Sequence, residues 1–144
     1  MGKYAIREVV TGKDLRKFIT FVDELYAGCD LFVPPLHKGQ ERDLMKYPAL
    51  AYCKRKMWIA EDAEGKVVGR ICCIINSRYN EKYGKKRARF GWFDLINDIE
   101  VAGLLVGTAE EWARENGMEE IHGPLFYNTL GRQGMLIEGF DKVA

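Results

Sequence analysis

The sequence lacks several features that would place a protein in a particular class. Its 22 lysines and arginines nearly balance 21 aspartates and glutamates, so the net charge of +1 predicts no general attraction to nucleic acid or to a membrane surface. No apolar run is long enough to cross a bilayer. The first ten residues, MGKYAIREVV, contain no apolar core of signal-peptide length. We therefore expect a cytoplasmic protein that binds neither membranes nor nucleic acid.

Metal-binding patterns are also missing. The four cysteines lack the paired short spacings that zinc sites use; they are Cys29, Cys53, Cys72 and Cys73. Cys72 and Cys73 are adjacent within an apolar run and should face opposite sides of a strand. We expect reduced, mostly buried thiols and no metal site.

What is present suits one globular domain. The chain has 144 residues, of which 47% are apolar and 30% are charged, an ordinary balance for a folded protein with its own core. No internal repeat, low-complexity tract or linker divides it. We expect residues 1–144 to form a single domain.

The first third of the chain predicts a strand, a helix and a break. Tyr4–Val10 favours a strand, and a helix with Thr11 as N-cap, Asp14 as its acidic partner and Gly28 as its stop should follow. Its apolar face has spacings of three and four residues and consists of Leu15, Phe18, Ile19, Val22, Leu25 and Tyr26. The motif FVPPL interrupts helical geometry, and we expect a short helix over Lys38–Met45 after it.

The middle of the chain changes to the period of strands. Met57–Glu61 and Lys66–Asn76 are apolar runs joined at Glu64-Gly65, which predicts a β-hairpin. The polar segment SRYNEKYGKK should then separate this hairpin from a third strand, Arg87–Leu95.

A strand-helix-strand unit is expected next. The helix, Asp98–Asn116, should end at Gly117 and lead directly into a strand over Glu119–Pro124. Its predicted buried stripe consists of Val101, Leu104, Leu105, Ala109 (or Thr108) and Trp112. A helical crossover of this kind implies that the two strands are parallel. Beyond Pro124 only Met135–Glu138 favours a short strand.

Several motifs resemble one protein superfamily. The runs GKVVGRICCIIN and AEEWARENGMEEIHGP are similar to a strand pair and to the helix and following strand of the GNAT acyltransferases. The matching positions in the first region are Ala60, Glu61, Gly65, Lys66, Val68, Gly69, Arg70 and Ile71. The motifs FVPPL, HGPLFYN and GMLIEGFD resemble a group of longer, poorly characterised bacterial GNAT-like proteins.

The resemblance implies an α/β fold of the α+β type, with a mixed sheet and the order β-α-α-β-β-β-α-β. A complete GNAT domain continues with a helix and two strands, and that helix usually carries the tyrosine that protonates the leaving thiolate. The resemblance therefore implies an incomplete domain, either shortened or completed by a partner. Because an incomplete sheet exposes an edge, we expect a homodimer or a missing C-terminal half.

The function implied by the resemblance is acyl transfer from acetyl-CoA to a small-molecule amine. Its alternative is a GNAT-like module that binds no cofactor and serves as a ligand-binding or interaction domain. In the enzyme, the pantetheine of the cofactor would pair with the backbone of Phe93, Asp94 and Leu95. The start of the following helix, at Val101, Ala102 and Gly103, would receive the pyrophosphate.

The sequence departs from the family at the pyrophosphate. The family usually has glutamine or arginine and two small residues at the positions of Asn97, Glu100 and Ala102, and only Ala102 is small. Asp98 and Glu100 would repel a pyrophosphate by about 1 kcal/mol each under surface screening. The same two acids suit a helix N-terminus that holds no ligand.

Three side chains are candidates for catalysis, each with a structural alternative. Asp94 lies on the strand that carries the general base in many GNAT enzymes, or it simply ends that strand facing solvent. His122 could transfer protons or serve as a hydrogen-bonded structural residue. Tyr127, with its neighbour Asn128, could contact substrate or pack within a loop.

Two basic features complete the expectations. The run EKYGKKRARF could receive a CoA phosphate, although a solvated loop that protects an edge strand is the favoured interpretation. Arg70 is expected to pair with an acid such as Glu61 across the hairpin rather than with a ligand.

Overall fold

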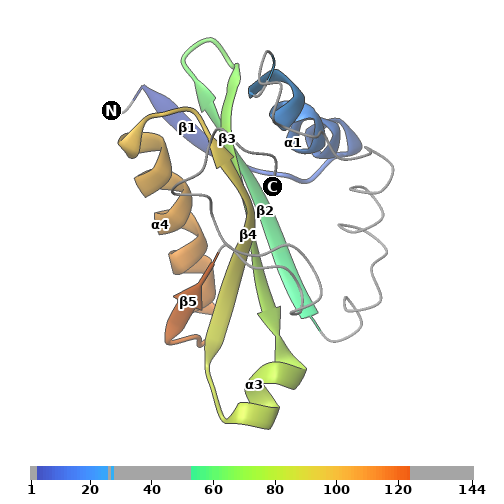
Figure 1. Cartoon of the computed structure of the whole chain (residues 1–144), viewed down its shortest axis with the longest axis vertical. Coiled ribbons are helices and arrows are strands. Elements are labelled where there is room, and N and C mark those ends of the chain that lie inside the picture. The colour runs from blue at the N-terminus through green and yellow to red at the C-terminus, as the bar shows by residue number, and fades with distance from the viewer. Residues whose placement is uncertain (1–2, 26, 28–52, 124–144) are drawn as a thin grey trace, which may run out of the picture.

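The computed structural model describes residues 3–25, 27 and 53–123, and the statements below concern these residues. One sheet contains, in this order, β1 (Tyr4–Glu8), β2 (Cys53–Asp62), β3 (Val67–Asn76), β4 (Arg87–Leu95) and β5 (Glu120–His122). The helices are α1 (Gly12–Leu25), α3 (Ser77–Tyr83) and α4 (Ile99–Glu115). Neighbouring strands are antiparallel except for β4 and β5, which are parallel (Figure 1). The predicted α+β fold with a mixed sheet is confirmed.

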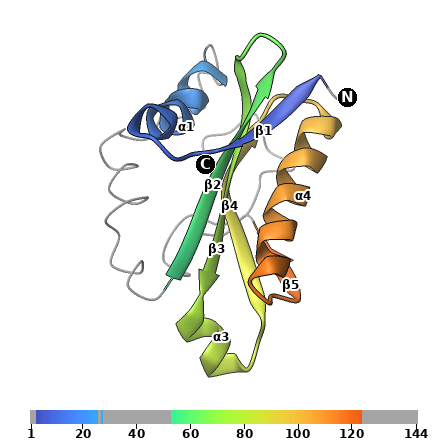
Figure 2. The ribbon, with the colours of Figure 1, turned by 180° about the vertical axis from the view of Figure 1, so that it is seen from behind.

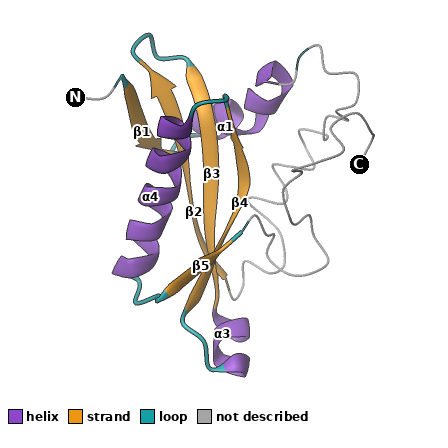
Figure 3. Ribbon diagram, turned by 60° about the vertical axis from the view of Figure 1, so that its left-hand side comes forward, coloured by secondary structure: helices purple, strands orange, loops and turns teal. Residues whose placement is uncertain are grey.

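Two helices cover opposite faces of the sheet. Figure 3 shows α4 on one side and α1 on the other. The alternation of side chains along β3 separates its two cysteines, because Cys73 packs in the core on the α4 side and Cys72 in the core on the α1 side. Both side chains are fully buried, which raises the pKa of the Cys73 thiol to about 12 and that of Cys72 further still. The expectation of buried thiols on opposite faces is confirmed for this pair.

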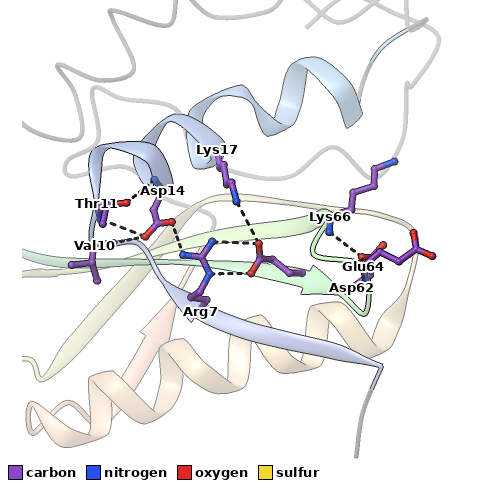
Figure 4. Close-up of polar contacts among 9 residues, drawn as sticks. Arg7, Val10, Thr11, Asp14, Lys17, Asp62, Glu64 and Lys66 are labelled. Carbon is purple, nitrogen blue, oxygen red and sulfur yellow. Dashed lines mark hydrogen bonds and ion pairs between the residues drawn. The ribbon is translucent and has the colours of Figure 1, made fainter.

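The start of α1 is held by a reciprocal cap. The backbone N–H of Asp14 donates to the Thr11 hydroxyl at 3.1 Å, and the backbone N–H of Thr11 donates back to the Asp14 carboxylate at 3.4 Å. Arg7 on β1 lies between the carboxylates of Asp14 and Glu61 and forms ion pairs with both (Figure 4). These contacts attach α1 to β1 and β2.

The predicted hairpin is confirmed as β2 and β3. The Asp62 carboxylate accepts hydrogen bonds from the backbone N–H groups of Glu64, at 2.9 Å, and Lys66, at 3.0 Å (Figure 4). Gly65 has a positive φ of 81°, a conformation that glycine adopts without strain. Strand β2 is longer than predicted, because it begins at Cys53 instead of Met57.

Helix α4 packs closely on β3 because position 69 is glycine. A Cβ atom there would lie 2.8 Å from Cδ1 of Leu105 and 3.0 Å from Cγ1 of Val101. The buried residues of the helix are spaced by four; they are Val101, Leu105, Ala109 and Ala113. The prediction of a buried Leu104 is wrong, since this residue is 37% exposed on the flank of the stripe.

The polar segment after β3 separates the hairpin from β4 as expected, and its first part forms a short helix that the sequence did not predict. Asn76 caps α3 by accepting the backbone N–H of Tyr79 at 3.0 Å, and Gly84 ends the helix in the left-handed conformation. Figure 2 shows α3 beyond the end of β3, at the opposite end of the sheet from the start of α4. The Asn and Gly that delimit it were visible in the sequence, but the seven residues between them carry no apolar stripe.

Several expectations lie outside the described residues. They are Cys29, the helix stop Gly28, the short helix Lys38–Met45, the candidates Tyr127 and Asn128, and the strand Met135–Glu138. Within the described part, no helix is long and apolar enough to cross a membrane.

Candidate active site

The candidate site lies on β4 beyond its pairing with β5. Antiparallel β3 accompanies β4 from Arg89 to Leu95, whereas β5 pairs with it only over Arg87–Arg89. Gly123 still lies tightly against β4, since a Cβ atom there would lie 2.4 Å from the carbonyl oxygen of Phe90. Beyond Arg89, the described residues place no strand against the side of β4 that faces away from β3.

The backbone of Phe93 and Leu95 points to this side. The N–H of Ile96 donates to the carbonyl of Val68 on β3 at 2.9 Å. Backbone groups alternate in direction along a regular strand, so the N–H and the carbonyl of Leu95 face away from β3. The N–H of Asp94, opposite Arg70, faces β3, so the Phe93 carbonyl on the same peptide also faces away. We call these outward backbone groups of Phe93 and Leu95 the β4 edge.

A bulge lies where this edge begins and includes Phe93. The pairing of β3 with β4 shifts between Arg70, opposite Asp94, and Cys72, opposite Gly91, so that β4 contains one extra residue. Trp92 within the bulge has a φ of 46°, which is rare for a bulky residue. Backbone strain of this kind costs about 1–3 kcal/mol and is concentrated at functional sites in proteins. The bulge changes the direction of β4 at the start of the β4 edge.

Asp94 is held by a buried arginine. Its carboxylate accepts from Nε of Arg70 at 3.0 Å and pairs with Nη2 at 2.8 Å, while Nη1 of Arg70 donates to the carbonyl of Phe18 at 2.8 Å. The Arg70 side chain is only 5% exposed, and that of Asp94 is 21% exposed. This ion pair ties β3, β4 and α1 together and fixes the direction of the candidate base.

Arg70 pairs with an acid as expected, but the partner is Asp94 on β4 and not Glu61 across the hairpin. On β2 the residue opposite Arg70 is Ile59, and on β4 it is Asp94, so the carboxylate on β4 is the direct neighbour. Glu61 pairs instead with Arg7 on β1, at 2.9 Å.

The start of α4 is occupied by acids of the chain itself. Asp98 is the N-cap: its Oδ1 accepts the backbone N–H of Glu100 at 2.9 Å, and its Oδ2 accepts the hydroxyl of Tyr4 at 2.6 Å. The hydrogen bond from Tyr4, followed by that from the Glu100 backbone, lowers the pKa of Asp98. The same contact raises the pKa of Tyr4 to about 12. Asp98 is therefore a fixed negative charge at this helix end.

The predicted pyrophosphate residues differ widely in exposure. Val101 is fully buried against Gly69, Ala102 is half-buried, and Gly103 is exposed with open space where a Cβ would lie. Glu100, in the first turn of α4, is exposed as well.

His122 lies far from Asp94. It is opposite Arg89 in the pairing of β5 with β4, which is five positions before Asp94, at about 3.3 Å per position. Its imidazole is 45% exposed and lies 3.5 Å from the carboxylate of Glu120. The structure therefore does not bring these two candidates together, and their catalytic roles stay predictions.

The basic run before the β4 edge is divided between two environments. Lys82, Lys85 and Lys86 are exposed, in agreement with a solvated segment. Arg87 instead pairs with Glu120 at 2.8 Å, and the buried Arg89 lies 4.6 Å from the centre of the Tyr79 ring. These two arginines hold α3 and β5 against β4.

The site therefore fits one part of CoA and opposes another. The β4 edge supplies backbone donors and acceptors that suit the amides of pantetheine. The helix end beyond it holds Asp98 and exposes Glu100, both of which repel a diphosphate. Among the described residues, no group of three or more histidine, cysteine, aspartate or glutamate side chains is arranged to hold a metal ion.

Sequence reasoning missed two residues of this region. Tyr4 reaches Asp98 across 94 positions in the chain, and no local pattern indicates such a contact. The strain at Trp92 was equally invisible, because a bulge depends on the register of two strands.

Comparisons with known proteins found a relative by sequence and solved structures with a similar fold. No protein-family model matches the sequence. The chain is 36% identical over 137 residues to the protein YghO of Escherichia coli K12, a match that covers 94% of this chain and 35% of that protein. The chain thus spans about a third of the length of this relative.

Solved structures share the fold at low sequence identity. An acetyltransferase of the GNAT family from Staphylococcus aureus Mu50 has a TM-score of 0.59 and 12% identity, and the match covers 85% of this chain and 73% of that one. A tandem GNAT protein from the clavulanic acid biosynthesis pathway has a TM-score of 0.65 and 16% identity, over 84% of this chain and 36% of that one. A GCN5-related N-acetyltransferase from Kribbella flavida has a TM-score of 0.54 and 18% identity, over 83% and 70%.

Proposed function

Because this chain has the GNAT acetyltransferase fold, we propose that it is an N-acyltransferase that takes its acyl group from a pantetheine thioester and passes it to a small-molecule amine. Acetyl-CoA is the first donor to test. The observation that carries the proposal is the β4 edge, where the Phe93 carbonyl and the backbone of Leu95 face away from β3 at a strained bulge.

The chain's own residues supply positioning and polarity. The N–H groups of the β4 edge would hold the pantetheine arm and polarise the thioester carbonyl. The amine nitrogen would attack that carbonyl carbon, so that a C–N bond forms and the C–S bond breaks. Asp94, fixed by Arg70, would accept the amine proton directly or through a water, and the thiolate leaves to be protonated by solvent or by a further residue.

One observation favours a second function. Asp98 already caps α4 and accepts the Tyr4 hydroxyl, so the helix end that would bind a diphosphate is satisfied by the chain itself. This supports a GNAT-like module that binds no cofactor and acts as an interaction domain. The two functions differ in whether any pantetheine thioester binds.

Calorimetric titration of acetyl-CoA distinguishes them. We expect micromolar binding by the natural chain and by Leu95→Ala, which keeps the backbone N–H. Leu95→Pro removes that N–H without removing a bond to β3, and a lost hydrogen bond should weaken binding about tenfold. Circular dichroism checks that both variants fold.

Two results would contradict the proposal. An equal effect of alanine and proline would show that the β4 edge does not hold the donor. If the folded natural chain bound neither acetyl-CoA nor S-acetyl-pantetheine, the acyltransferase would be excluded and the interaction module favoured.

A further inference from the structure

We infer that the acyl donor is a pantetheine thioester ending in at most one phosphate, rather than one ending in the diphosphate of a nucleotide. The inference rests on the proposed function and names the class of its donor. It follows from a disagreement between the two halves of the site, since the β4 edge suits the pantetheine arm and the start of α4 opposes the diphosphate.

The two halves of the site are close neighbours along the chain. Strand β4 ends at Leu95 and α4 begins at Ile99, so the β4 edge leads within a few residues to the helix N-terminus. A helix N-terminus normally attracts phosphate through its unpaired N–H groups and its dipole. Here the N–H of Glu100 is already bonded to Asp98, and the carboxylate neutralises the dipole.

Asp98 is also held in place from a second direction. Its other oxygen accepts the Tyr4 hydroxyl at 2.6 Å, so both oxygens have a partner and a phosphate cannot displace the side chain without breaking two hydrogen bonds. Glu100 adds an exposed carboxylate in the first turn. Lys3, just before β1, is a cation that acts on Asp98, and a single charge offsets only part of this repulsion.

A donor with a less charged end avoids the repulsion. Pantetheine itself is uncharged, and 4′-phosphopantetheine carries one phosphate group, whereas CoA carries a diphosphate and a further 3′-phosphate. The amides of the arm are common to all three and match the β4 edge. Affinity should therefore fall as the charge at the far end of the donor rises.

The test compares three donors in calorimetric titrations: S-acetyl-pantetheine, S-acetyl-4′-phosphopantetheine and acetyl-CoA. We expect the natural chain to bind the first two at least as tightly as acetyl-CoA. Asp98→Asn keeps a good N-cap but removes the charge, and Glu100→Gln removes the second charge. Each variant should tighten acetyl-CoA binding about fivefold, while leaving S-acetyl-pantetheine within twofold.

Two matched controls isolate the charge at this position. Glu111→Gln removes an exposed carboxylate further along α4 and should change no affinity. Tyr4→Phe removes the hydroxyl but no charge, and it should alter acetyl-CoA binding far less than Asp98→Asn does.

The outcomes separate this inference from the proposed function. Acetyl-CoA binding at least tenfold tighter than S-acetyl-pantetheine, with no gain from Asp98→Asn or Glu100→Gln, would overturn the inference and leave the acyltransferase intact. Failure of all three thioesters to bind a folded chain would overturn both.

Discussion

At the scale of single residues, the most consequential side chain is Arg70. It stands in a strand whose neighbours are nearly all buried and apolar, and its guanidinium is satisfied by Asp94 and by the Phe18 carbonyl. A buried charge must find such partners, because desolvation without them is costly. The candidate base and the attachment of α1 therefore depend on the same arginine.

Replacing Arg70 by methionine should destabilise the protein by about 2–4 kcal/mol, because it leaves the Asp94 carboxylate and the Phe18 carbonyl without this partner. Urea denaturation measures the change. Lys66→Met is the control, since the ion pair between Lys66 and Glu24 is 3.7 Å long and largely exposed. The urea midpoint of this variant should hardly differ from that of the natural chain. Equal effects of the two substitutions would show that the buried pair contributes nothing special.

The sequence predicted that Arg70 has an acidic partner but not which one. The hairpin could be predicted from neighbouring residues alone, and it made Glu61 the nearest candidate for the acidic partner of Arg70. The actual partner lies on β4, at 24 positions from Arg70, where its register depends on a bulge that has no sequence signature.

At the scale of elements, the position of α4 on the sheet depends on Gly69 in β3. Gly69 lets Leu105 and Val101 approach the backbone of β3, and this contact sets where the N-terminus of α4 lies relative to the β4 edge. The position of Asp98 at the candidate site is therefore a consequence of packing on the α4 face.

Gly69→Ala should cost about 1–3 kcal/mol of unfolding free energy, because a methyl group meets two buried side chains that have little room to move. Thermal denaturation measures the loss. Gly107→Ala, on the open face of α4, has no atom within 4 Å of the added Cβ and should instead stabilise the helix by about 0.5–1 kcal/mol. A stable Gly69→Ala protein would mean that α4 is not seated as described.

Helix periodicity in the sequence predicted most of the buried stripe of α4 and failed for one residue beside that stripe. The bounds of α4 differ from the prediction by one residue at each end, and β4 was predicted at its observed bounds. Leu104 was assigned to the buried stripe because Leu is apolar, yet the buried positions of α4 follow a spacing of four from Val101, and Leu104 lies beside that row. Apolar periodicity cannot report how wide the opposing surface is.

At the scale of the whole molecule, the sheet joins two cores, and a charged network holds β1, β2 and α1 at one end. Hydrogen bonding to Arg7 is the main cause that lowers the pKa of Asp14 to about 2 and that also lowers the pKa of Glu61. Both carboxylates have lower pKa values when folded than when unfolded. Their contribution to stability is therefore present above their ordinary pKa values and is lost as the pH falls through the folded ones.

We expect the unfolding free energy to decrease as the pH is lowered from about 4.5 towards about 2. Arg7→Gln should lower stability at neutral pH and flatten this dependence. Urea denaturation at several pH values tests both effects. Arg16→Gln, an exposed arginine on α1, should leave the slope unchanged, and a similar slope in Arg7→Gln would show that Arg7 does not hold these two acids.

The central claim is that the β4 edge holds the acyl donor, and amide-resolved NMR of this 16.5 kDa chain tests it most directly. Titration with S-acetyl-pantetheine and with acetyl-CoA should shift the amide signals of Phe93 and Leu95 first, while those of Tyr4–Glu8 on β1 stay in place. Signals that shift only elsewhere in the chain, or no shift with either thioester, would contradict it.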